Sequence, residues 1–271
     1  MKRILTFILT LTLALSFCVN SFAAATTATA SETQTGTSEA QTDTSKTQAG
    51  TSEAQTDTSK VQAGASYGIS NLSGAPDIVA ESAVVMDANT GTILYGKEAD
   101  TKRYPASITK VMTALLAVEN CKMSDVITYS NAAVNGIEAG SSTAGINVGA
   151  KLTVEDSLYA LMLVSANEAA AAIAEHISGS TTEFAKLMTK RAKELGCTNT
   201  QFKNPHGLPN EEHYTTAHDM AIIFDAALKN DVFRYVDSTA AYTIPATNKY
   251  GERNCTSTNQ LINGARPYEG V

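Results

Sequence analysis

A 14-residue repeat of small and polar residues limits how much of this chain can fold. The repeat begins at Gly36 and recurs from Gly50 with one change, since Thr47 corresponds to Val61. Residues 26–66 contain no aromatic side chain, and Val61 is their one large or branched apolar residue. Such a segment cannot bury enough surface to offset the entropy lost on ordering. Residues 26–75 are therefore predicted to be a disordered linker, and the folded domain is expected at 76–271.

The residues before the linker have the pattern of a secretory signal peptide. Lys2 and Arg3 precede an apolar run over residues 4–19, and Ala23, Ala24 and Ala25 follow it. The run is short for a transmembrane span, so residues 1–25 are predicted to be a cleaved signal. An uncleaved anchor helix is the alternative. We expect the mature protein to be secreted and to work outside the cytoplasm.

Charge and cysteine content exclude several classes of protein. The chain has 20 Lys and Arg against 27 Asp and Glu, a net charge of -7, which excludes a strongly basic nucleic-acid binder. Cys121, Cys197 and Cys255 remain after the signal, too far apart for a zinc site, and are interpreted as buried apolar thiols. Neither His206, in a predicted turn, nor His218, in a helix first turn, belongs to a metal-binding pattern. No metal or cofactor is predicted.

Local patterns predict a mixture of strands and helices. Residues 82–88 and 92–95 read as two strands joined by a turn at 89–91, and 242–244 as a further short strand. An apolar helix is predicted to begin at Ser107, just after Pro105. Capping boxes predict three more helices, and a small-residue helix is expected to end at Gly179. These helices span 153–164, 180–196, 216–229 and 169–177. The pattern indicates an α/β fold of the α+β type with an antiparallel sheet, but two strands alone are not stable and their partner strands are not obvious.

The start of the apolar helix carries the first candidate for catalysis. Ser107 and Lys110 are three residues apart, so both side chains lie on one helix face. A buried lysine has a lowered pKa and can act as the base that activates a serine. The backbone N–H groups of the helix N-terminus lie near the oxyanion that would develop. Because a single S-x-x-K match also arises by chance, the alternative is a capping serine followed by a solvated lysine.

Two further sequence motifs are candidates for a role in catalysis. Ser165 and Asn167 lie in a break between two helices, where a hydroxyl and an amide can relay a proton and hold a substrate amide. Taken alone, these two residues indicate no more than a polar loop. Taken together with Ser107 and Lys110, they lead to the specific hypothesis that the two motifs lie on either side of one cleft. Residues 64–68 fit the G-x-S-x-G nucleophile elbow, yet the linker precedes them where that elbow needs a buried strand.

Several segments together resemble the serine D-alanyl-D-alanine carboxypeptidases, the low-molecular-mass penicillin-binding proteins. The resemblance runs in order from about Ile78 to the last residue. Its motifs are Asp87-Ala88-Asn89-Thr90-Gly91, Pro105-Ala106-Ser107-Ile108-Thr109-Lys110, Ser165-Ala166-Asn167-Glu168-Ala169-Ala170, Ala174-Glu175-His176-Ile177-Ser178-Gly179, Asn204-Pro205-His206-Gly207-Leu208-Pro209, His213-Tyr214-Thr215-Thr216-Ala217 and Ser257-Thr258-Asn259-Gln260-Leu261.

The resemblance implies a penicilloyl-serine-transferase, β-lactamase-like fold, with a helical cluster against a five-stranded antiparallel sheet. It further implies that Ser107 is the nucleophile, Lys110 the general base and Ser165 a proton relay, while Asn167 binds the substrate amide. The implied substrate is a peptidoglycan stem peptide ending in D-Ala-D-Ala, processed in the cell envelope during wall synthesis and remodelling. β-Lactams are the implied acylating inhibitors.

The chain departs from the family in one motif. Lys-Thr-Gly, which the family carries on a sheet strand, occurs nowhere in the sequence. We therefore expect a domain truncated before this motif, without the C-terminal tail through which relatives attach to the membrane. The expected activity is that of a serine DD-carboxypeptidase. The alternatives are an inactive fragment or wall-binding remnant, and a β-lactamase of the same fold.

Overall fold

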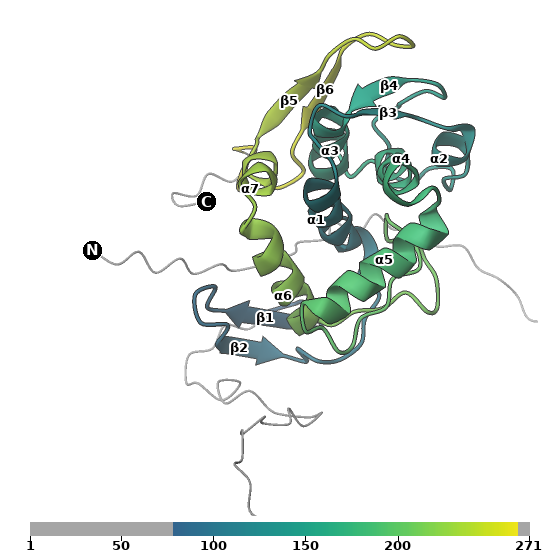
Figure 1. Cartoon of the computed structure of the whole chain (residues 1–271). Helices are drawn as coiled ribbons and strands as arrows, with labels where there is room; N and C mark the ends of the chain where they lie inside the picture. Colours follow the sequence, from purple (N-terminus) through teal and green to yellow (C-terminus); the bar gives the residue numbers. More distant parts are fainter. Residues whose placement is uncertain (1–77, 265–271) are drawn as a thin grey trace, which may run out of the picture. The chain divides into compact units, whose positions relative to one another are not determined.

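A computed structural model describes residues 78–264, and the predicted signal peptide, the whole predicted linker and the G-x-S-x-G match lie outside them. Seven helices occur within this part of the chain, and a short 3-10 helix, η1 (Ala106–Thr109), leads into the first of them (Figure 1). These are α1 (Lys110–Asn120), α2 (Asn131–Asn135), α3 (Val154–Leu163), α4 (Asn167–Ser178), α5 (Thr181–Glu194), α6 (Ala217–Leu228) and α7 (Asp231–Asp237).

The strands of the described residues form three separate antiparallel pairs. They are β1 (Ala83–Met86) with β2 (Ile93–Lys97), β3 (Val126–Thr128) with β4 (Lys151–Thr153), and β5 (Ala241–Ile244) with β6 (Arg253–Thr256). The β1–β2 hairpin and β5 were predicted, whereas β3, β4 and β6 were not. Within residues 78–264, β1 and β2 pair only with each other, and β1 packs on α6.

The capping boxes place the helix starts where the sequence predicts them. Thr153, Ser180 and Thr216 each accept a hydrogen bond from the backbone N–H three residues later. Each cap satisfies an N–H group that has no partner within the helix. Gly179 ends α4 in the left-handed conformation, with φ of 76°. The prediction for α4 was wrong at its start, because the helix already begins at Asn167.

The core lies where α1, α3 and α4 pack together, in the middle of the view in Figure 1. Five alanines and one isoleucine of α4 are almost completely buried. Small side chains allow the neighbouring helices to approach α4 closely, and α1 and α3 fill the space with Met112, Leu115, Leu158 and Leu161. Both helices that flank residues 164–166 therefore pack on α1.

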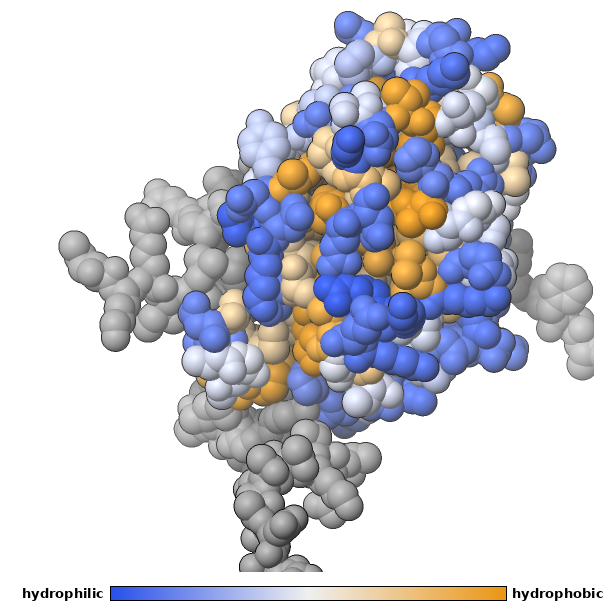
Figure 2. All heavy atoms as spheres, in the orientation of Figure 1, coloured by the Kyte–Doolittle hydropathy of each residue, from blue (hydrophilic) through white to orange (hydrophobic). Residues whose placement is uncertain are grey.

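The surface is mixed in polarity, as expected for a protein of this composition. Figure 2 shows hydrophobic residues across the middle of one face, between hydrophilic residues toward its edges. None of the helices in residues 78–264 is both long and apolar enough to cross a membrane. Cys197 and Cys255 are buried free thiols, as predicted, whereas Cys121 is free but only partly buried.

Candidate active site

Ser107 and Lys110 are brought together by a tight 3-10 turn. Ser107 lies in η1, and Lys110 is the first residue of α1. A 3-10 helix has three residues per turn, so residues i and i+3 eclipse each other. The Lys110 amine donates a hydrogen bond of 3.2 Å to the Ser107 hydroxyl. The preceding Ala106 has φ of 50°, a strained value for a residue with a side chain. The strain is localised beside the candidate nucleophile.

Lys110 is buried rather than solvated, so the alternative interpretation of the motif is wrong. Its relative exposure is 3%. Burial lowers the pKa of its amine to about 8, and the negative charge of Glu168 opposes this by raising it. Ser107 itself is exposed and caps no helix. The pair therefore combines an accessible hydroxyl with an amine whose pKa is about 8 rather than the ordinary 10.5, so that a larger fraction of it is free to act as a general base for serine.

A loop from a distant part of the sequence holds the Lys110 turn from the other side. The Lys110 amine donates to the carbonyl oxygen of His206 at 2.9 Å, and Thr113 donates to the carbonyl of Pro205 at 2.6 Å. Gly207, with φ of 87°, packs so closely that a Cβ there would lie 1.8 Å from the Ala106 carbonyl oxygen. The sequence predicted only a turn in this segment, and its support of the site was not predicted. Gly207 was the one local indication of such a close contact.

His213 supports the same turn through a buried hydrogen bond. Its Nδ1 accepts from the backbone N–H of Lys203 at 3.1 Å, so the ring proton must lie on Nε2. Nε2 then donates to the Thr109 hydroxyl at 2.9 Å. Burial lowers the pKa of His213 to about 4, and burial together with the charge of Lys110 does the same for His206. Both rings are therefore neutral near pH 7.

Ser165 and Asn167 lie at the junction of α3 and α4, as predicted. Ser165 adopts the left-handed conformation, with φ of 58°, and Asn167 begins α4. The Ser165 hydroxyl and the Asn167 side-chain oxygen are buried and have no hydrogen-bond partner within the described residues. Unpaired buried polar atoms are costly, and they cluster where a substrate or water will pair with them. Their closeness to Lys110 is indicated by the packing of α4 on α1 and by the charge of the adjacent Glu168.

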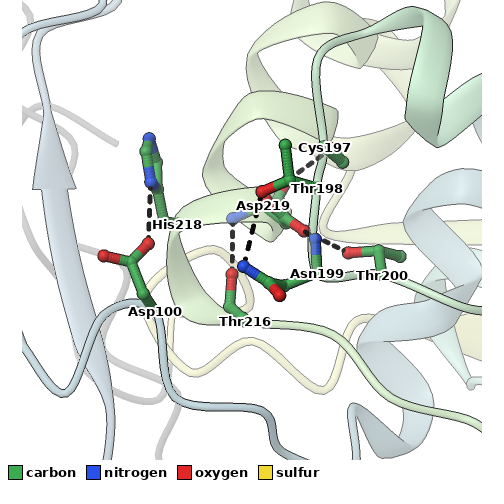
Figure 3. Close-up of polar contacts among 8 residues, drawn as sticks. All are labelled: Asp100, Cys197, Thr198, Asn199, Thr200, Thr216, His218 and Asp219. Carbon is green, nitrogen blue, oxygen red and sulfur yellow. Dashed lines mark hydrogen bonds and ion pairs between the residues drawn. The ribbon is translucent and has the colours of Figure 1, made fainter. Parts of the chain in front are cut away.

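Asp219 and His218 make hydrogen bonds and ion pairs within the fold. The Asp219 carboxylate accepts hydrogen bonds from the backbone N–H of Asn199 at 2.8 Å and from the hydroxyl of Thr200 at 2.7 Å (Figure 3). His218 Nδ1 lies 3.0 Å from the Asp100 carboxylate in the same view. Within residues 78–264, no three His, Cys, Asp or Glu side chains gather as they would around a metal ion.

A sequence model of the D-alanyl-D-alanine carboxypeptidase family matches residues 70–268. The chain belongs to this family. It is 39% identical over 198 residues to the D-alanyl-D-alanine carboxypeptidase DacF of Bacillus subtilis, covering 71% of this chain and 50% of that one. It is 36% identical over 198 residues to the D-alanyl-D-alanine carboxypeptidase of Streptomyces sp. K15, covering 70% of this chain and 68% of that one. The carboxypeptidase domain thus spans about half the length of DacF.

Solved structures place the domain in the same fold. The crystal structure of the Streptomyces K15 DD-transpeptidase aligns with a TM-score of 0.65 at 35% identity, covering 70% of this chain and 78% of that one. The D-alanyl-D-alanine carboxypeptidase DacD from Francisella tularensis aligns with a TM-score of 0.59 at 34% identity, covering 69% of this chain and 45% of that one. The predicted fold class is confirmed.

Proposed function

We propose that this protein is a serine DD-carboxypeptidase, which removes the terminal D-alanine from peptidoglycan stem peptides during wall synthesis and remodelling. The observation that carries the proposal is the buried Lys110 amine, 3.2 Å from the accessible Ser107 hydroxyl. Membership of the carboxypeptidase family supplies the substrate class, since the matched relatives carry this activity in their names.

In the first step Ser107 is acylated. Lys110, as the free amine, accepts the proton of the Ser107 hydroxyl while the oxygen attacks the carbonyl carbon of the D-Ala-D-Ala peptide bond. The tetrahedral intermediate collapses when that C–N bond breaks. We assign Ser165 to relay the proton from Lys110 to the departing amine of D-alanine, which returns Lys110 to the free amine, because the Ser165 hydroxyl is buried, unpaired and held at the helix junction. Asn167 binds the substrate amide through its unpaired side-chain oxygen.

In the second step Lys110 accepts a proton from the water that attacks the ester carbonyl and gives it to Ser107 as the ester C–O bond breaks, and the shortened peptide leaves. The Streptomyces relative is a DD-transpeptidase, and in transpeptidation an amine replaces water as the acceptor. Both reactions share the acyl-enzyme. A β-lactam acylates the same serine, but its acyl group is hydrolysed slowly.

The location of the activity is also part of the proposal. The signal-peptide pattern of residues 1–25 supports secretion, and the linker at 26–75 would let the domain reach into the surrounding wall polymer. The substrate is extracytoplasmic, which agrees with secretion. Membrane attachment through a C-terminal tail, as in relatives, is proposed for the whole protein rather than for residues 78–264.

The test is the intact mass of the purified chain after incubation with benzylpenicillin, beside Ser107→Ala. We expect one penicilloyl adduct that is absent from the variant, and release of D-alanine from a peptide ending in D-Ala-D-Ala. Rapid loss of the adduct would favour a β-lactamase, and transfer to an added amine would favour transpeptidation. A folded chain that forms no adduct would contradict the proposal and leave the wall-binding remnant.

A further inference from the structure

Glu168 is a buried acid for which the proposed reaction has no use. It follows Asn167 directly in the first turn of α4, and its relative exposure is 2%. One carboxylate oxygen, Oε1, accepts hydrogen bonds from the Thr143 hydroxyl at 2.6 Å and from the backbone N–H groups of Ala144 at 2.7 Å and Ile146 at 3.3 Å. The other oxygen, Oε2, is buried and has no partner within the described residues.

The contacts of Lys110 show why a nearby negative charge would affect its amine. The two hydrogen bonds that the structure gives its amine go to neutral oxygens, those of Ser107 and His206. No ion pair to Lys110 occurs among the described residues. α4 packs against α1, and both Glu168 and Lys110 are buried, so water screens the attraction between the carboxylate and the amine less than it would at the surface.

Other charged or titratable groups near α1 come from the elements packed against it, and most are already paired. His206 and His213 face the Lys110 turn as neutral rings. Arg191 of α5 pairs with Glu119 near the far end of α1. Several others also have partners: Asp156 of α3 accepts a hydrogen bond from Tyr242, Asp219 of α6 from Thr200, and Asp225 of α6 pairs with Lys229. Asp237 lies on α7, and Arg253, which donates to the Gly145 carbonyl, lies on β6, which packs on α3.

We propose that the buried carboxylate of Glu168 is a positioning residue that sets the charge environment of Lys110, and thereby the fraction of that amine free to accept the Ser107 proton. Burial alone would drive the amine to lose its proton at still lower pH, and Glu168 opposes this. The same carboxylate ties the segment 143–146 to the Ser165–Asn167 junction. The role of Glu168 rests on the proposed function of Lys110 as the base.

The test measures the titration of Lys110 directly, so that it does not depend on activity. The lysine Cε resonances of the full chain are followed by NMR from pH 6 to 11, and Lys110→Arg identifies the Lys110 signal. We expect Glu168→Gln to lower the Lys110 midpoint by on the order of one pH unit, because one buried negative charge is removed. Glutamine keeps the shape of the side chain and the acceptor at Oε1.

Two variants of the exposed Thr143 provide matched controls. Thr143→Val removes the hydroxyl bonded to Glu168 but changes no charge, so the Lys110 midpoint is expected to stay within about 0.3 pH unit of wild type. Thr143→Lys removes the same hydroxyl and adds a positive charge beside the carboxylate. It is expected to lower the midpoint in the same direction as Glu168→Gln, and it tests the idea even if the buried substitution does not fold.

A Lys110 midpoint unchanged in a folded Glu168→Gln would overturn the proposal. So would a midpoint in Thr143→Lys equal to that in Thr143→Val. Benzylpenicillin acylation is measured on the same samples, and its acid limb is expected to move with the Lys110 midpoint. If Lys110 shifts as expected but no variant is acylated, wild type included, the effect of Glu168 on the charge of Lys110 stands, whereas the proposed function, and with it the catalytic use of that effect, fails.

Discussion

At the scale of single residues, environment decides the chemistry more than residue type does. Lys110 and His213 are ordinary titrating groups in water, yet burial lowers the pKa of the first to about 8 and of the second to about 4. The apolar residues after Lys110 predicted its burial from sequence. Nothing local in the sequence indicated that His213, over a hundred residues away, would donate a hydrogen bond to Thr109.

The buried His213 makes the stability of the fold depend on pH. Its pKa is about 4 in the folded state and near 6.5 when unfolded, so between these values the unfolded chain binds more protons. Its contribution is complete above pH 6.5 and is lost as pH falls toward 4. We expect the unfolding free energy to drop by about 2 kcal/mol from this group between pH 7 and pH 5.

Urea unfolding at both pH values measures this effect, with His213→Gln as the comparison. Glutamine does not titrate, so the variant is expected to be less stable at pH 7 but to lose about 2 kcal/mol less on acidification. His206 stays in both proteins and contributes equally to each. An identical drop in both proteins would show that His213 is not held neutral by burial.

At the scale of elements, the site depends on a close contact between η1 and the loop around Gly207. The helix starts were predictable because capping is local, as at Thr153, Ser180 and Thr216. The 3-10 turn at Ser107 was not, since it depends on the loop at 204–208, which binds the Lys110 amine and leaves no room beside Ala106.

Gly207→Ala tests this contact. The new Cβ would lie 1.8 Å from the Ala106 carbonyl oxygen, so the loop or the Ser107 turn must move. A displacement of about 1 Å costs on the order of 100-fold in rate, and we expect a loss of at least that size in benzylpenicillin acylation. Acylation kinetics by mass spectrometry give the measurement.

Gly196→Ala is the matched control for this substitution. Gly196 also has a positive φ, of 99°, but nothing lies within 4 Å of the position of its Cβ. Both variants therefore carry the backbone strain of about 1–2 kcal/mol, and only Gly207→Ala carries the clash. Equal acylation rates in the two variants would contradict the supporting role of the loop.

At the scale of the whole molecule, the fold is organised around α4. Its buried alanines let α1, α2, α3 and α5 pack against a single helix, whose first residue is Asn167. The described sheets have two strands each, so the helical cluster carries most of the buried apolar surface of residues 78–264.

Ala170→Leu is expected to destabilise this arrangement. Ala170 is fully buried, and added methylenes in a packed core cost about 1–3 kcal/mol. His176→Leu, at an exposed position of the same helix, is expected to change the unfolding free energy by less than about 0.5 kcal/mol. Urea unfolding monitored by circular dichroism distinguishes them, and similar stabilities would mean that α4 tolerates larger side chains.

The sequence by itself determined what depends on neighbours along the chain. Capping boxes and a turn predicted the helix starts and the first hairpin, and the S-x-x-K spacing put Ser107 and Lys110 on one turn. Tertiary structure alone decided which distant groups meet there: the His206 carbonyl, the His213 ring and the Glu168 charge. The short strands β3, β4 and β6 were also missed, because a strand of three or four residues is defined by its partner rather than by its own pattern.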